Sequence, residues 1–403
     1  MSKKDSYIID AVRTPIGKFG VSLASIRTDD LAAHVIRSLM GRHDFNLERI
    51  DDVIMGCANQ AGEDNRNVAR MALLLAGLPF SVPGETLNRL CASGMSAVIN
   101  AHRAIQSGDG DLIIAGGVEH MTRGPWVISK ASKAFGRDAK MEDSSFGWRF
   151  INPQMQELYG AEGMGQTAEN LAEKYDINRD DQDAFAYHSQ MKAALAQKEG
   201  TFESEIAPVE IPQRKADPII FKDDEFLKPH TSIEGLAKLK PAFKKDGTVT
   251  AGNSSGLNDG AAAMLIASEN GVKMHNVNPI ARIVASAVVG VEPCIMGIGP
   301  VQAANKALTK AGLTMDKMDI IELNEAFSAQ SLACIRQWGL SDDDARINPN
   351  GGALALGHPL GMTGTRILQT AALELQRKQK KYALATMCVG VGQGYAVIIE
   401  NIK

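Results

Sequence analysis

The hexapeptide Asp52-Val53-Ile54-Met55-Gly56-Cys57 has a close counterpart near the other end of the chain, Asp319-Ile320-Ile321-Glu322-Leu323-Asn324. Each is a short apolar run that follows a segment with an Ala-Ala pair, at residues 32–33 and 303–304 respectively. A helix followed by a buried strand at both ends of a chain indicates two similar α/β halves. Many α/β chains contain such units, so the repeat alone leaves coincidence open.

The sequence around the first hexapeptide alternates between strand-like and helix-like segments. The apolar runs at 53–56 and 112–117 are typical of buried strands, and between them apolar residues recur at helical spacing over 95–105. This alternation predicts a mostly parallel sheet with helices packed on it. The same alternation returns from about residue 249 to the end of the chain.

The middle of the chain has a different character. It is rich in charge and proline, and its clearest helical signals lie at 168–174 and 180–198. We read it as a large insertion over the core. The sequence therefore predicts three parts: a first half of residues 1–120 and 249–275, an inserted loop domain of residues 121–248, and a second half of residues 276–403.

Composition narrows the class of protein. The formal net charge is −4, so nothing favours a nucleic-acid partner. No apolar run approaches the ~18 residues needed to cross a membrane, and no signal or transit peptide is expected. The five cysteines are odd in number and widely spaced, which favours a reducing compartment and a cytoplasmic protein. The eight histidines are scattered and no C-x-x-C pair exists, so no metal site is expected.

One cysteine stands where a helical pattern begins, in Asn88-Arg89-Leu90-Cys91-Ala92-Ser93-Gly94-Met95. The unpaired N–H groups and the positive dipole end of a helix N-terminus lower the pKa of a thiol, and the small neighbours would let a substrate approach. Cys91 is therefore a candidate nucleophile. A packed cysteine beneath a helix is the alternative that this segment leaves open.

A histidine lies in the glycine-rich segment Gly351-Gly352-Ala353-Leu354-Ala355-Leu356-Gly357-His358-Pro359. Glycines let a ligand approach closely, and the proline disfavours a helical conformation at His358. A neutral imidazole is a suitable base for a thiol near neutral pH, so His358 is a candidate base. A histidine in an ordinary turn is the alternative.

Two further polar residues follow strand-like runs. Cys388 ends one such run and precedes glycines at 390, 392 and 394, whose free N–H groups suit an oxyanion pocket beside a proton-transferring thiol. The G-x-G-x-G spacing, followed by another apolar run, argues against a dinucleotide site. Asn324 could hold a water for an oxyanion or cap the helix that follows, and from its segment alone capping is favoured.

Together and in this order, these segments resemble the thiolase family over essentially the whole chain, from Asp10-Ala11-Val12-Arg13-Thr14-Pro15 to Ala385-Thr386-Met387-Cys388-Val389-Gly390. The resemblance implies the thiolase fold, in which two similar α/β halves form five layers, α-β-α-β-α, with an inserted loop domain that binds coenzyme A (CoA). It also implies a homo-oligomer, a dimer or a tetramer. The enzyme would be an acyltransferase with no permanently bound cofactor, using CoA and acyl-CoA as co-substrates.

The resemblance implies a role for each candidate. Cys91 is the nucleophile that becomes acylated, and His358 is the base that deprotonates it. Cys388 protonates the departing enolate, or removes the α-proton in synthesis. Asn324, through a water, and His358 stabilise the thioester enolate, while the backbone N–H groups of Cys91 and Gly390 stabilise the acyl-transfer oxyanion. Cleavage that expels a carbon leaving group needs such a proton donor beside that carbon.

Residues that contact CoA are also implied. Ser255 would contact the pantetheine, and Lys228 stands where some relatives carry an arginine near the nucleotide phosphate. The full expected set is Met164, Lys228, Phe243, Ala251, Ser255 and Ala326.

Two stretches are similar to the thiolases that act on 3-oxoadipyl-CoA, residues 56–67 and 147–153. The segment Glu119-His120-Met121 departs from that subfamily and is more like the thiolases of fatty-acid degradation. The expected substrate is 3-oxoadipyl-CoA, with a fatty-acid 3-ketoacyl-CoA or acetoacetyl-CoA as the alternative. The distal carboxylate of an adipyl chain needs a cation, and Arg149 and Arg123 are the candidates.

Two other classes are disfavoured. A ketoacyl synthase would share the fold and the nucleophile but would use two histidines, whereas this chain has a cysteine at 388. A non-catalytic acyl-CoA-binding relative would have no need of Cys91, His358 and Cys388 together.

Overall fold

The computed structural model describes residues 4–402, and a ten-stranded sheet forms its centre. The strand order is β12-β13-β14-β11-β1-β10-β5-β3-β4, with β2 paired to β10. The strands of this sheet are β1 (Ser6–Arg13), β2 (Gly17–Lys18), β3 (Asp52–Gly56), β4 (Gly84–Leu87), β5 (Leu112–His120), β10 (Asn258–Ser268), β11 (Ala281–Gly290), β12 (Ile320–Leu323), β13 (Tyr382–Val389) and β14 (Gln393–Asn401).

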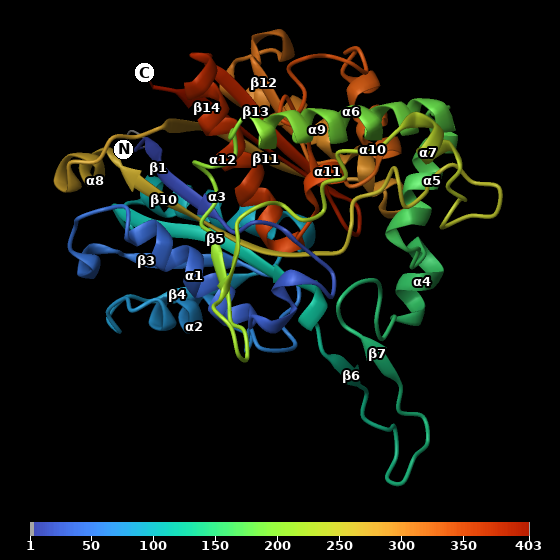
Figure 1. Ribbon diagram of the computed structural model, residues 1–403, viewed down its shortest axis with the longest axis horizontal. Helices are drawn as coiled ribbons and strands as arrows, with labels where there is room; N and C mark the ends of the chain where they lie inside the picture. Colours follow the sequence, from blue (N-terminus) through green and yellow to red (C-terminus); the bar gives the residue numbers. More distant parts are fainter. Residues whose placement is uncertain (1–3, 403) are drawn as a thin grey trace.

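Helices cover both faces of the sheet and fill the inserted segment (Figure 1). They are α1 (Thr28–Met40), α2 (Val68–Leu75), α3 (Ser93–Ser107), α4 (Pro153–Tyr159), α5 (Met164–Lys174), α6 (Arg179–Lys198), α7 (Ile233–Ala237), α8 (Glu269–His275), α9 (Gly299–Ala311), α10 (Ser328–Gln337), α11 (Ala353–Leu356) and α12 (Leu360–Lys378).

The sequence repeat corresponds to a repeat in the structure. The first hexapeptide contains the whole of β3 and the second the whole of β12. Each of these strands runs parallel to its inner neighbour, β5 or β13. The two Ala-Ala pairs lie on α1 and α9, both of which bury them. Strands β1 and β11 join the two halves through the residue pairs Tyr7–Arg282 and Ile8–Ala281.

The expectation of a mostly parallel sheet is wrong. Among the described strands, the parallel pairs are β3–β4, β3–β5 and β12–β13, and the longer ladders are antiparallel. Strands β13 and β14 are joined by residues 390–392, and so short a turn connects only antiparallel neighbours. Strand β10 likewise lies antiparallel to both β1 and β5.

The buried clusters show five layers. Helices α3 and α12 lie between the two halves, where Met95 and Ile367 share one cluster with Ile113 of the first half and Val397 of the second. A second cluster packs α1 and α2 on the outer face of the first half, and a third packs α9 and α10 on the second. The order is therefore α-β-α-β-α, which confirms the fold expected from the resemblance; the boundaries of the three parts stay a prediction.

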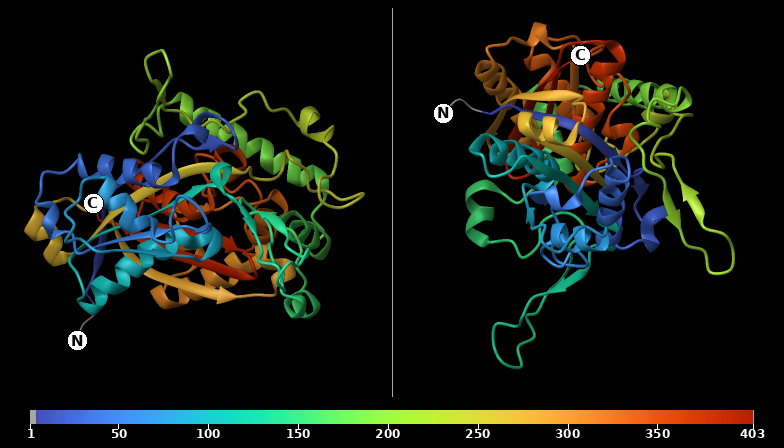
Figure 2. Two further views of the ribbon diagram at one scale, coloured as in Figure 1. Left: turned by 90° about the horizontal axis from the view of Figure 1, so that it is seen from below. Right: turned by 90° about the vertical axis from the view of Figure 1, so that its left-hand side faces the viewer.

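The inserted segment forms α4 to α7 and two small ribbons. Strands β6 (Trp126–Ile128) and β7 (Met141–Asp143) form one ribbon, and β8 (Val209–Ile211) and β9 (Ile219–Phe221) form the other. Both ribbons project from the body of the molecule (Figures 1 and 2). Across residues 4–402, no helix combines the length and apolar character needed to cross a membrane.

Candidate active site

Cys91 lies in a short 3₁₀ turn, Leu90–Ala92, directly before α3 begins at Ser93. Leu90 has a φ of 47°, an uncommon backbone conformation for a residue other than glycine. Its N–H donates to Asn88 Oδ1 at 2.8 Å, and its carbonyl accepts from Ser93 Oγ at 2.7 Å. These bonds hold the strained turn and fix the cysteine at the helix N-terminus, where the sequence predicts it.

Two backbone N–H groups converge on the Cys91 sulfur, that of Gly390 and that of Cys91 itself. They favour the thiolate, but burial disfavours it more strongly and raises the pKa of the Cys91 thiol to about 11. The low thiol pKa expected from the helix N-terminus is therefore wrong for the free protein. Because the thiol is held as a thiol, a nearby base is needed to make the nucleophile.

Cys388 lies near the end of β13 and is buried, as the strand-like run before it predicts. Burial raises the pKa of its thiol well above the ordinary value, and a negative charge on Cys91 raises it further. The two sulfurs are thus close enough to interact electrostatically. A thiol that keeps its proton beside Cys91 is suited to protonate a carbanion leaving group.

His358 is buried just before α12, which begins at Leu360 after the N-cap Pro359. Its backbone N–H donates to Asn258 Oδ1 at 3.0 Å, and its Nδ1 lies 2.8 Å from Thr363 Oγ1. Burial, and then the charge of Arg366, lower the pKa of the imidazole to about 3. The ring is therefore neutral in the free protein and carries a lone pair on one of its nitrogens.

Asn324 does not cap a helix. Helix α10 begins at Ser328 with Phe327 as its N-cap, so the capping interpretation favoured from the segment is wrong. The Asn324 side chain turns instead toward the histidine, with Nδ2 at 3.4 Å from His358 Nε2. Its Oδ1 is buried and has no partner among the described residues, so it could accept a hydrogen bond from a water.

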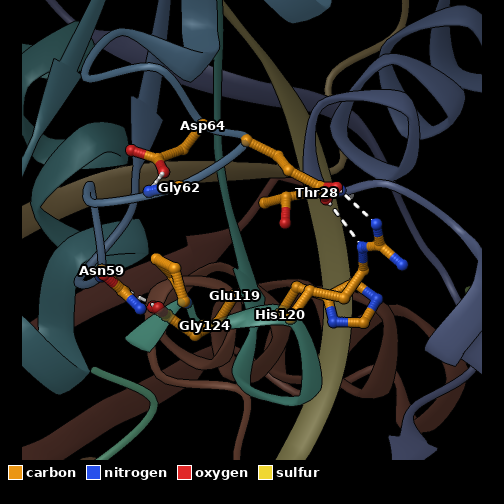
Figure 3. Close-up of a pocket in the computed structure, with 10 residues that line it drawn as sticks. Thr28, Asn59, Gly62, Asp64, Glu119, His120 and Gly124 are labelled. Atoms are coloured by element: carbon orange, nitrogen blue, oxygen red, sulfur yellow. Dashed lines mark hydrogen bonds and ion pairs between the residues drawn. The ribbon is translucent and has the colours of Figure 1, made fainter. Parts of the chain in front are cut away.

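Glu119 is a buried residue of the site that the sequence did not single out. Its carboxylate accepts from the backbone N–H groups of Ala58, Asn59 and Gly361, which joins the loop after β3 to the start of α12. Burial raises its pKa to about 7, against these three donors. Figure 3 shows Glu119 and Asn59 at the small pocket that they line with His120. The only feature of the sequence that could have pointed to Glu119 is its position at the end of an apolar run.

Asn258 and Thr363, which contact the histidine, were also missed. Their local sequence does not distinguish them from other polar residues. The partner of Asn258 is distant in the sequence, and the partner of Thr363 lies on a turn whose shape the sequence does not give. The contact between Asn258 and His358 also requires a glycine at position 357, because a Cβ there would lie 2.6 Å from the Asn258 side chain.

Four of the expected CoA contacts belong to, or contact, the buried cluster that contains Cys388. Ala326 and Cys388 share a buried cluster on which Met164 packs, and the Ser255 N–H donates to the Ala326 carbonyl at 3.0 Å. Phe243 is half exposed and meets Phe327 edge-to-face. Ala251 is exposed four residues before Ser255. Lys228 is not in this group, and its Nζ lies 4.6 Å from the centre of the Phe226 ring.

The two candidate arginines differ in their partners. Arg123 forms an ion pair with Glu63, and its Nη1 donates to the Ala24 carbonyl. Arg149 donates to the Ser144 carbonyl at 3.2 Å and has no acidic partner among the described residues. Of the two arginines, Arg149 is therefore the one whose positive charge is not paired with a carboxylate and can pair with a ligand.

Comparisons with known proteins agree with this geometry. The family model of the thiolase N-terminal domain matches residues 6–270, and that of the thiolase C-terminal domain matches residues 277–401. The chain is 56% identical to the beta-ketoadipyl-CoA thiolase of Acinetobacter baylyi, over 99% of this chain and 100% of that protein. It is 54% identical to the 3-oxoadipyl-CoA/3-oxo-5,6-dehydrosuberyl-CoA thiolase of Escherichia coli, with the same coverage.

Among solved structures, human mitochondrial 3-ketoacyl-CoA thiolase in complex with CoA matches with a TM-score of 0.92 and 41% identity. The match covers 99% of this chain and 98% of the human one. The fold of two repeated halves, with one cysteine at a helix N-terminus, a second buried cysteine and a buried histidine, is that of an acyl-transferring enzyme of the thiolase type. The chain belongs to the thiolase family.

Proposed function

We propose that this thiolase cleaves 3-oxoadipyl-CoA with CoA to give acetyl-CoA and succinyl-CoA. The observation that carries the proposal is the full-length identity of 54–56% to relatives named for this substrate. Two contacts support the chemistry: Asn324 with His358, and Cys91 with Cys388. The Asn324 N–H joins the two pairs, because it donates to the Thr386 carbonyl two residues before Cys388.

The first half-reaction breaks the C2–C3 bond of the substrate. His358 Nε2 takes the Cys91 proton and the sulfur adds to C3, whose oxygen becomes an anion held by the N–H groups of Cys91 and Gly390. Collapse of this adduct expels the C2 carbanion as the enolate of acetyl-CoA. His358 and an Asn324-bound water stabilise the enolate oxygen, and Cys388 donates the proton that completes acetyl-CoA.

The second half-reaction releases the acyl group from Cys91. The thiol of a second CoA gives its proton to the Cys388 thiolate left by the first half-reaction and attacks the thioester. The same pair of backbone N–H groups stabilises the new oxyanion, and the Cys91 sulfur leaves as it takes back its proton from His358. Because both CoA molecules use one site in turn, the expected contacts at Met164, Phe243, Ala251, Ser255, Ala326 and Lys228 would serve both half-reactions.

The substrate carboxylate distinguishes an adipyl chain from a fatty-acyl chain. We assign it to Arg149, because Arg123 is already neutralised by Glu63. A buried or half-buried arginine holds a carboxylate by paired hydrogen bonds, which a neutral chain end does not use.

The test is a thiolysis assay with 3-oxoadipyl-CoA and 3-oxohexanoyl-CoA, which have the same carbon chain and differ in the terminal carboxylate. We expect kcat/KM to favour the adipyl compound by roughly 10- to 100-fold. Arg149→Met should abolish that preference without lowering activity on the hexanoyl compound. A wild-type enzyme that prefers the hexanoyl chain would make it a fatty-acid or acetoacetyl thiolase instead. If Arg149→Met and Arg123→Met both left adipyl thiolysis intact, the pocket assignment would fail.

We further propose a cytoplasmic homo-oligomer, a dimer or a tetramer. All five cysteines are free, and the proposed chemistry needs two of them reduced. Exposed apolar side chains on the β6–β7 ribbon, Trp126, Ile128, Phe135 and Met141, support a contact with another subunit there. Light scattering of the purified protein and of a Phe135→Ser variant tests the assembly.

A further inference from the structure

We infer that Thr363 is a positioning residue that fixes the tautomer of His358 and so makes Nε2 the basic nitrogen of the site. The inference rests on the proposed role of His358 as the base for Cys91. It concerns a residue on α12, five positions after the histidine, that would touch neither substrate nor CoA.

The Thr363 hydroxyl can only accept a hydrogen bond from the histidine, because its own proton is donated elsewhere. Its single proton is used, because Oγ1 lies 2.8 Å from the Pro359 carbonyl, which can only accept. The same oxygen lies 2.8 Å from His358 Nδ1 and must therefore accept there. Nδ1 consequently carries the proton, and in the neutral ring Nε2 carries the lone pair.

The other side of the ring agrees with this assignment. Asn324 Nδ2, a donor, faces His358 Nε2 at 3.4 Å. The histidine backbone is fixed as well, since its N–H donates to Asn258 Oδ1. Ring and backbone are thus each held by a side chain, and the lone pair of Nε2 faces the Asn324 amide.

A hydroxyl partner also has a consequence that a carboxylate would not have. Many catalytic histidines have a carboxylate behind Nδ1, which favours the imidazolium. Here the residue behind Nδ1 is neutral, and the charge that lowers the pKa of the ring is the cation of Arg366. Both features keep the imidazole neutral until it takes the thiol proton.

The inference is tested by replacing the hydroxyl with a methyl group of the same size. In Thr363→Val, Nδ1–H would be buried without an acceptor, so the ring would turn or change tautomer and Nε2 would lose its basic lone pair. Thr365→Val is the matched control, because Thr365 is a buried threonine of the same helix whose hydroxyl has no partner among the described residues. Thr363→Ser restores the hydroxyl and should restore function.

The readouts are thiolysis kinetics, the rate at which iodoacetamide alkylates Cys91, and the melting temperature. We expect Thr363→Val to lower kcat and the alkylation rate by roughly 10- to 100-fold with little change in the KM for CoA. Thr363→Ser and Thr365→Val should stay near wild type. If Thr363→Val proves unfolded by its melting temperature, Thr363→Ala takes its place with the same expectation.

Two results would overturn the inference. One is a folded Thr363→Val enzyme as active as Thr365→Val, and the other is a folded Thr363→Ser enzyme no more active than Thr363→Val. A wild-type protein without thiolysis would instead overturn the proposed function. In that case the alkylation rates of Cys91 still decide whether Thr363 controls the base.

Discussion

The Nδ2 atom of Asn324 lies 3.4 Å from Nε2 of His358, although one residue follows β12 and the other precedes α12. The pair brings a polar amide and a basic ring nitrogen to one buried point. In the proposed mechanism this pair stabilises the enolate oxyanion, which forms in one chemical step of the cycle.

Replacing Asn324 should therefore separate the two half-reactions. Asn324→Ala removes the amide that would hold a water at the enolate oxygen, so C–C cleavage should slow by roughly 10²- to 10³-fold. Acetylation of Cys91 by acetyl-CoA uses the other oxyanion site and should proceed near the wild-type rate. Steady-state thiolysis and mass spectrometry of the acetylated enzyme measure the two steps. Equal losses in both would contradict separate oxyanion sites.

Cys388 should be needed for proton transfer at carbon and not for acyl transfer. Cys388→Ala removes the buried thiol beside Cys91, so exchange of deuterium from solvent into the methyl group of acetyl-CoA should fall at least about 100-fold. The acetyl-Cys91 adduct should still form. NMR of the recovered acetyl-CoA measures the exchange, and undiminished exchange in the variant would assign the proton transfer to another group.

Two glycines at the start of α5 offer a matched test of the CoA side. A Cβ on Gly165 would lie 2.2 Å from the Phe243 ring, whereas a Cβ on Gly163 would have no neighbour within 4 Å. Gly165→Ala should displace Phe243 and raise the KM for CoA several-fold, by roughly 1 kcal/mol of lost binding. Gly163→Ala should leave KM unchanged. Indistinguishable KM values for the two variants would argue against Phe243 as a CoA contact.

Arg13 anchors the inserted segment to the sheet. Its buried guanidinium pairs with Glu205 and, through two nitrogens, with Asp224. Arg13→Met leaves two buried carboxylates without a partner and should destabilise the protein by about 3–5 kcal/mol. Arg27→Met removes the ion pairs of a half-exposed arginine with Asp29 and Glu63 and should cost about 1 kcal/mol or less. Urea unfolding measures both, and similar losses for the two variants would contradict the anchoring role.

Glu322 should make stability fall as pH rises. Burial raises its pKa to about 8, against the attraction of Arg366. Because the folded-state pKa lies above the ordinary value, the stabilising contribution is complete below about pH 4.5 and is lost as pH rises through about 8. Between pH 6.5 and 9 the wild type should lose about 1–3 kcal/mol more than Glu322→Gln.

Unfolding curves at several pH values provide the measurement for Glu322. The exposed Glu269→Gln variant serves as the control, since its carboxylate stays ionised over this window. A wild-type slope that Glu322→Gln leaves unchanged would show that another group titrates.

The sequence predicted correctly those features that depend on residues close together in the chain, and it failed on features that depend on distant segments. The hexapeptide repeat, the helical face at residues 95–105 and the strand before Cys388 depend on neighbours within a few residues, and the structure confirms them. Strand direction was wrong because it is set by how distant strands pair. The capping interpretation of Asn324 was wrong because a tertiary contact with His358 replaced a local one.

The sequence by itself determined the family, the two-fold repeat and the four candidate residues Cys91, Asn324, His358 and Cys388, because side-chain type and periodicity are properties of the chain. Only the tertiary structure decided how those residues behave. Burial held Cys91 as a thiol and His358 as a neutral imidazole, and the approach of α12 to the sheet placed Thr363 beside His358 and Gly361 beside Glu119. Desolvation and hydrogen-bond partners depend on packing between distant segments, and no local pattern encodes them.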